Sequence, residues 1–132
     1  MKIGFTNGCF DILHIGHVEL FKFAKSACDY LIVALDTDNK ISANKGPNRP
    51  FNALSDRIAM VTAIRYVDEV RSFASPQELD TLVDMIRPDV MVVGSDYEDK
   101  EVVGSQHAKK LLFFRRLDGY STTKILENTL NR

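Results

Sequence analysis

The sequence contains only two cysteines, Cys9 and Cys28, and no tryptophan in 132 residues. Two cysteines are too few for a disulfide framework or a cysteine metal cluster, so we expect small buried residues in a reducing compartment. The sequence also has no apolar run near the roughly 18 residues of a membrane span. No basic segment followed by an apolar one marks a signal peptide at the N-terminus. We therefore expect a cytoplasmic protein without a membrane partner.

Charge of one sign is not in excess either. The formal net charge is −1 and the sequence pI is about 6.3. A general nucleic-acid binder is usually basic, so this balance argues against a nucleic-acid partner. It leaves open a local positive pocket for a small phosphate compound. The length fits one domain, which we expect to span residues 1–132.

Short apolar runs alternate with amphipathic stretches along the chain. Because parallel sheets are built from such alternation, we predict an α/β fold: a single doubly wound, Rossmann-like, three-layer domain with a mainly parallel five-stranded sheet. The polar segment 36–52 predicts a long loop. Ser75-Pro76-Gln77-Glu78 predicts a helix start, with Ser75 as the cap. The predicted strands lie within residues 2–6, 30–35, 67–73, 89–94 and 110–114.

Four polar loops follow predicted strands and should gather at one edge of the sheet. In doubly wound sheets the ligand site lies beyond the carboxyl ends of the strands, where the strand order reverses. We therefore expect the loops to form one site together. They span residues 6–17, 36–52, 94–106 and 115–121.

The first of these loops contains His14 and His17, three residues apart and separated by Gly16. If a helix begins near Gly16, both imidazoles lie at its first turn, beside free backbone N–H groups that bind phosphate. Gly16 would allow a phosphate to approach the backbone closely, and Asp11 could orient the loop by bonding backbone N–H groups. Metal ligation is the alternative, but no convincing third ligand accompanies the two histidines.

The other loops hold charged and hydroxyl side chains with two interpretations each. Lys45, Arg49 and Arg57 either neutralise polyphosphate charge or form a solvated basic segment. Asp96 either contacts a sugar, a base or a hydrated Mg²⁺, or belongs to a solvated acidic loop. The same choice, between phosphate contact and a surface or capping role, applies to Arg116 and to the helix start at residues 121–123.

Two motifs at opposite ends of the chain resemble one known family. Residues 8–17, GCFDILHIGH, are similar to the GxFDxxHxGH signature of the cytidylyltransferase-like nucleotidyltransferases, and residues 121–125 resemble their ISTTKI-type signature. The resemblance implies attack by a substrate phosphate on the α-phosphate of a nucleoside triphosphate, with release of pyrophosphate. It also implies a Mg²⁺ ion that arrives with the triphosphate. We expect no protein metal site, because no third ligand accompanies the histidines, and we expect a homodimer.

Two branches of the family compete. Residues 6–11, 45–50 and 93–97 resemble the adenylyltransferase domain of ADP-heptose synthase, which uses ATP and a heptose 1-phosphate. Residues 64–68 and 116–125 resemble glycerol-3-phosphate cytidylyltransferase, which uses CTP. We expect the first activity, with the second as the alternative. A nucleotide-binding sensor without turnover is the alternative from another class.

The resemblance also implies roles for individual residues. The catalytic residues would be His14, His17, Lys45 and Arg116. The nucleotide would be bound by Thr6, Gly8, Cys9, Phe10, Gly16, Gly94, Asp96, Ser121 and Thr122. The phosphorylated sugar or polyol acceptor would be bound by Asp11, Arg49 and Arg57.

Overall fold

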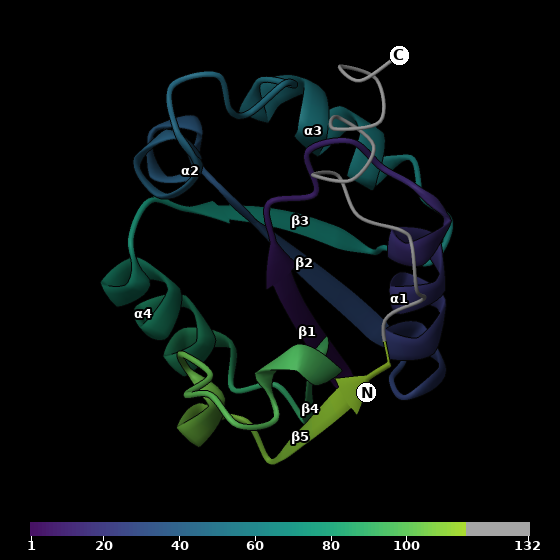
Figure 1. The fold of residues 1–132 in the computed structure, drawn as a ribbon. Helices are drawn as coiled ribbons and strands as arrows, with labels where there is room; N and C mark the ends of the chain where they lie inside the picture. The colour runs from purple at the N-terminus through teal and green to yellow at the C-terminus, as the bar shows by residue number, and fades with distance from the viewer. Residues whose placement is uncertain (116–132) are drawn as a thin grey trace.

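The computed structural model describes residues 1–115, which form five strands alternating with helices (Figure 1). Arg116, Ser121, Thr122 and the predicted last helix lie outside the described residues. The strands are β1 (Ile3–Gly8), β2 (Tyr30–Asp36), β3 (Glu69–Phe73), β4 (Val90–Gly94) and β5 (Lys110–Phe114). The helices are α1 (Ile15–Ser26), α2 (Asp38–Lys45), α3 (Leu54–Thr62) and α4 (Pro76–Ile86), with short 3-10 turns η1 (Ser95–Tyr97) and η2 (Ser105–His107).

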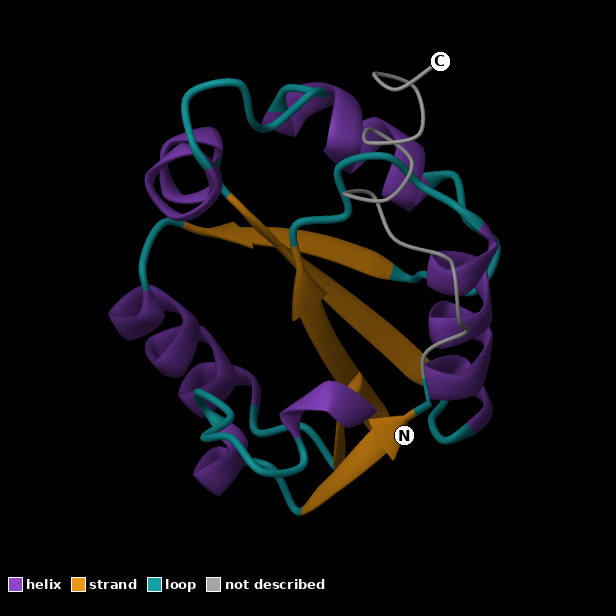
Figure 2. Cartoon of the chain, in the orientation of Figure 1, coloured by secondary structure: helices purple, strands orange, loops and turns teal. Residues whose placement is uncertain are grey.

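The strands form one sheet in the order β3-β2-β1-β4-β5, and every neighbouring pair is parallel (Figure 2). The chain runs outward from β1 to β3 on one side and returns to β4 and β5 on the other. This reversal beside β1 is the point at which a ligand site is expected. The predicted doubly wound α/β fold with a parallel five-stranded sheet is confirmed.

Both faces of the sheet are covered by helices. Alternate residues of β2 take opposite sides: Leu31 and Val33 pack with residues of α1 and α3, whereas Ile32 and Ala34 pack with residues of α4. In Figure 1, α1 and α4 accordingly lie on opposite sides of the sheet. Burial on both faces explains why β2 reads as an uninterrupted apolar run, which parallel strands commonly are.

The segment 36–52 departs from the prediction of a long loop, because it contains helix α2. Ile41 is the only residue of α2 that is buried, so the helix lacks the apolar period that marks amphipathic helices. The prediction for α4 is confirmed: the helix begins at Pro76, and the Ser75 hydroxyl accepts a hydrogen bond from the Glu78 N–H at 3.1 Å.

Three aspartates hold the amino ends of the two central strands. Backbone N–H groups at the start of β1 and β2 each donate to one carboxylate at 2.8 Å: Lys2 to Asp29, Ile3 to Asp89, and Leu31 to Asp68. Asp68 also accepts a hydrogen bond from Lys25 of α1. Burial alone would raise the pKa of Asp68, but the bonds from Lys25 and the Leu31 N–H outweigh it and hold the pKa below its usual value.

This lowered pKa predicts a loss of stability in acid. The stabilisation from the Asp68 carboxylate is complete above the pKa of an aspartate in the unfolded chain, which is about 4. It disappears as the pH falls through the lower pKa that Asp68 has in the folded protein. We expect the free energy of unfolding of Asp68→Asn to fall less steeply below about pH 5 than that of the wild type. Urea unfolding at a series of pH values measures this. Asp99→Asn, in an exposed loop, is the control, and its free energy of unfolding should change with pH as that of the wild type does. If the free energy of unfolding of Asp68→Asn has the same pH dependence as the wild type, Asp68 does not have this role.

Candidate active site

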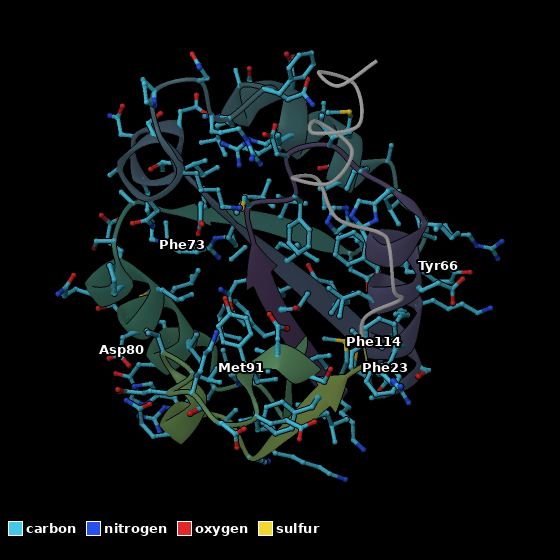
Figure 3. The ribbon with its side chains drawn as sticks, viewed as in Figure 1. Phe23, Tyr66, Phe73, Asp80, Met91 and Phe114 are labelled. Atoms are coloured by element: carbon cyan, nitrogen blue, oxygen red, sulfur yellow. The ribbon has the colours of Figure 1, made fainter. Side chains whose placement is uncertain are left out.

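A cavity of about 460 Å³ lies at the carboxyl edge of the sheet. Its wall is built from the ends of β1, β2 and β4 together with the loops and helices that follow them, as the topology requires. Figure 3 shows the side chains, with Phe73 of the wall between α2 and α4. The predicted site residues that line the cavity are Thr6, Gly8, Cys9, Phe10, His14, Gly16, His17, Lys45 and Gly94.

The two histidines form a reciprocal cap at the start of α1. Nδ1 of His14, the N-cap residue, accepts a hydrogen bond from the Gly16 N–H at 3.1 Å, and Nδ1 of His17 accepts one from the His14 N–H at 3.3 Å. The rings stack with centroids 3.8 Å apart. A neutral imidazole that accepts at one nitrogen carries its proton on the other. Both rings are therefore hydrogen-bond donors at Nε2.

Phe10 fixes the ring of His17 from the other side. Its backbone has a φ of 47°, in the left-handed region, and its side chain is only 5% exposed. The ring meets His17 edge-on at 5.3 Å and Phe21 of α1 at 5.0 Å. A Cβ at Gly8 would stand 3.1 Å from the Phe10 ring, so the glycine leaves this space open. The predicted nucleotide-binding residue Phe10 thus supports the histidine.

Cations reach the cavity from α2. Lys45, the last residue of α2, donates from Nζ to the Cys9 Sγ at 3.0 Å, which joins the helix to the loop after β1. The sequence prediction missed several residues of the wall, among them Asp36 at the end of β2 and Lys40 and Asn44 of α2. Lys40 and Asn44 are four residues apart, and this spacing would have placed them on one helical face, had the segment been recognised as a helix.

Asp11 and Arg49 lie next to the cavity wall but are not part of it. The Asp11 carboxylate is fully buried and accepts from the Phe51 and Asn52 N–H groups at 2.8 Å each and from Arg49 Nε at 3.2 Å. These bonds confirm the expectation that Asp11 orients a loop through backbone N–H groups. They join the loop after β1 to the segment that precedes α3.

Arg57 of α3 is also fully buried and does not reach the cavity. Its guanidinium donates to three backbone carbonyls, of Asn52 at 2.9 Å, Cys9 at 2.9 Å and Asp36 at 2.8 Å. A fourth bond joins Nη2 to the Asp38 carboxylate at 2.7 Å. The structure therefore gives Arg57 a supporting position between the loops, and contact with an acceptor stays a prediction for Arg57, Arg49 and Asp11.

Thr6, Gly94 and Asp96, which were predicted to bind the nucleotide, lie in or just after β1 and β4. The buried Thr6 hydroxyl donates to the Val92 carbonyl at 2.8 Å, which ties β1 to β4 beneath the cavity. A Cβ at Gly94 would lie 2.5 Å from the Asp96 carboxylate, so that carboxylate folds back over the glycine. Asp96 itself is exposed and does not line the cavity.

Residues 1–115 contain no group of three or more histidine, cysteine or acidic side chains that could hold a metal ion. Within the same range, no helix is long and apolar enough to cross a membrane.

Residues 5–130 match the sequence model of the cytidylyltransferase-like family. The chain belongs to this family. The family predicted from the two motifs is thereby confirmed, and its match includes the segment beyond residue 115 that contains the second motif.

Curated relatives share close to half of the sequence. The bifunctional proteins HldE of Sulfurimonas denitrificans and Helicobacter hepaticus are each 46% identical, over 129 and 127 residues. Each match covers 96% of this chain and 26% of the relative, so the chain spans about a quarter of the length of these proteins.

Solved structures share the fold at lower identity. A lipopolysaccharide core biosynthesis protein from Thermoplasma volcanium superimposes with a TM-score of 0.72 at 23% identity, covering 89% of this chain and 99% of that one. A pantoate-beta-alanine ligase from Francisella tularensis gives a TM-score of 0.63 at 18% identity, covering 96% of this chain and 65% of that one. These two similarities support the fold alone.

The buried position of Arg57 predicts a large effect on stability. Arg57→Met leaves three backbone carbonyls and the half-exposed Asp38 carboxylate without their donor. Each acceptor left unsatisfied in the interior costs about 1–3 kcal/mol, so the total is on the order of 3–5 kcal/mol. We expect a loss of that order in the free energy of unfolding, measured in urea. Arg71→Met, which removes an exposed arginine paired with Glu69, is the matched control and should stay within ~0.5 kcal/mol of the wild type. Equal losses in both variants would contradict this role of Arg57.

Proposed function

We propose that this chain transfers a nucleoside monophosphate from a nucleoside triphosphate to the phosphate of a small sugar phosphate, releasing pyrophosphate. The observation that carries the proposal is the histidine pair at the start of α1: both residues line the cavity at the carboxyl edge of the sheet, and both rings are donors at Nε2. The dipole of α1, whose positive end lies at the histidine pair, favours an anion in the same place.

The proposed reaction matches what this site can do chemically. The nucleophile is a phosphate oxygen that is already an anion, so no side chain has to remove a proton. Catalysis then consists of positioning two phosphates and stabilising charge on the transferred one. Neutral imidazole donors at His14 and His17 and the ammonium of Lys45 supply that stabilisation. We expect Mg²⁺ to enter with the triphosphate and to neutralise part of its charge.

We propose heptose 1-phosphate and ATP as the substrates. The support is the resemblance of residues 6–11, 45–50 and 93–97 to the adenylyltransferase domain of ADP-heptose synthase, together with the 46% identity to bifunctional proteins HldE. Glycerol 3-phosphate with CTP is the second candidate, because residues 64–68 and 116–125 resemble the corresponding cytidylyltransferase.

A pyrophosphate-release assay tests the proposal by crossing ATP and CTP with heptose 1-phosphate and glycerol 3-phosphate. Release with ATP and heptose 1-phosphate is the expected result. Release with CTP and glycerol 3-phosphate alone would favour the second candidate. Nucleotide binding without release in any combination would contradict transfer and favour a sensor.

His17 provides the sharpest test of the mechanism. His17→Ala removes one charge-stabilising donor, and we expect kcat to fall by a factor of at least ~10² with a native circular dichroism spectrum. His107→Ala is the control, because His107 lies outside the cavity wall with its Nε2 at 3.2 Å from Asp80. Its turnover should remain close to that of the wild type. Near-normal turnover of His17→Ala would exclude the assigned role.

A further inference from the structure

The cavity wall has two sides with different chemistry. One side is mainly apolar and comes from β4, the loop that follows it and β5. Its apolar and aromatic members are Val93, Tyr97, Val102, Val103 and Phe114, and Glu101 of the same loop adds a carboxylate. The other side is polar and comes from the end of β2 and from α2; its members are Asp36, Lys40, Asn44 and Lys45. Because β1 lies between β2 and β4 in the sheet, the histidine loop that follows β1 separates the two sides.

The polar side contains an ion pair that is largely withdrawn from solvent. Lys40 Nζ lies 3.6 Å from the Asp36 carboxylate, and the two side chains are only 19% and 15% exposed. Lys40 Nζ also lies 5.5 Å from the centre of the Phe73 ring. An exposed lysine such as Lys109, at 79%, avoids this desolvation. A charge pair kept in a cavity wall at such a cost indicates a polar ligand there.

The geometry of the pair leaves hydrogen-bonding capacity for that ligand. At 3.6 Å, the separation of Lys40 and Asp36 exceeds a hydrogen bond, so the ammonium keeps donors and the carboxylate keeps acceptors to offer. Asn44 lies one helical turn beyond Lys40 on α2, about 6 Å along the axis. An anion and neighbouring hydroxyl groups can therefore be bound by one face.

We propose that Asp36, Lys40 and Asn44 form the acceptor subsite, with Lys40 on the phosphate of the acceptor and Asp36 and Asn44 on sugar hydroxyls. This inference rests on the proposed function, which requires two phosphates to meet beside the histidines. A nucleobase gains from apolar contact, which the β4 side offers, whereas a sugar phosphate is polar throughout. The acceptor accordingly takes the α2 side, and the ion pair selects an anionic, hydroxyl-rich compound.

Lys40→Met tests the subsite, because it keeps the aliphatic stem over Phe73 and removes the charge. We expect the KM for heptose 1-phosphate to rise about tenfold or more, with the KM for ATP and kcat at saturating acceptor nearly unchanged, as for the loss of a binding contact. Lys40→Arg should recover part of the loss. Lys22→Met, at an exposed position of α1, is the matched control and should leave both constants unchanged.

Two results would overturn the subsite: an equal rise in the KM for ATP, which would assign Lys40 to the nucleotide, or no change in either constant. Calorimetric titration of heptose 1-phosphate into the wild type and Lys40→Met separates this inference from the proposed function. If the wild type binds heptose 1-phosphate, Lys40→Met binds it more weakly, and the wild type releases no pyrophosphate, the subsite is supported although the transfer reaction fails. Equal binding by both proteins would overturn the subsite even if transfer is observed.

Discussion

The buried guanidinium of Arg57 is the interaction on which the order of the cavity depends. Parallel strands end at one edge of a sheet, so the chain leaves β1 and β2 side by side with carbonyl groups that lack ladder partners. Such groups are costly to bury unpaired. Arg57 satisfies two of them, on Cys9 and Asp36, and a third on Asn52. Asp11 complements it by accepting from backbone N–H groups, so donors and acceptors of the same loops are both satisfied.

The positions of His14 and His17 depend on the hydrogen bond that Arg57 makes to the loop after β1. Arg57 fixes the carbonyl of Cys9, and the left-handed turn at Phe10 comes directly after it. That turn places an aromatic ring against His17, whose Nδ1 in turn caps the helix. With Nδ1 engaged in this way, an imidazole cannot accept a proton there without losing its capping bond. The site is therefore better suited to stabilising charge than to general base catalysis, in agreement with the proposed reaction, whose nucleophile is already an anion.

The sequence predicted the sheet and the histidine loop because both have strong local signals. Continuous apolar runs identify β2 and β4, and the spacing of His14 and His17 around Gly16 identifies the helix start. Helix α2 was missed because Ile41 is its only buried residue, and with it the cavity-facing Lys40 was missed. The supporting position of Arg57 was not predicted, because the sequence cannot reveal that two of its partners are distant carbonyls. Hydrogen bonds between segments 21 and 48 residues apart arise only in the folded chain.

Helix α2 has little apolar contact with the core, and this affects which residues of the site can vary. The helix is held by Ile41 and by polar ties, from Asp38 to Arg57 and from Lys45 to Cys9. Its cavity-facing positions at Lys40 and Asn44 therefore contribute little to the core, and they can change without disturbing the apolar packing around Phe10 that fixes His17. In the proposed function the chemistry of transfer therefore belongs to the β1–α1 connection, and recognition of the acceptor belongs to the polar helix beside it.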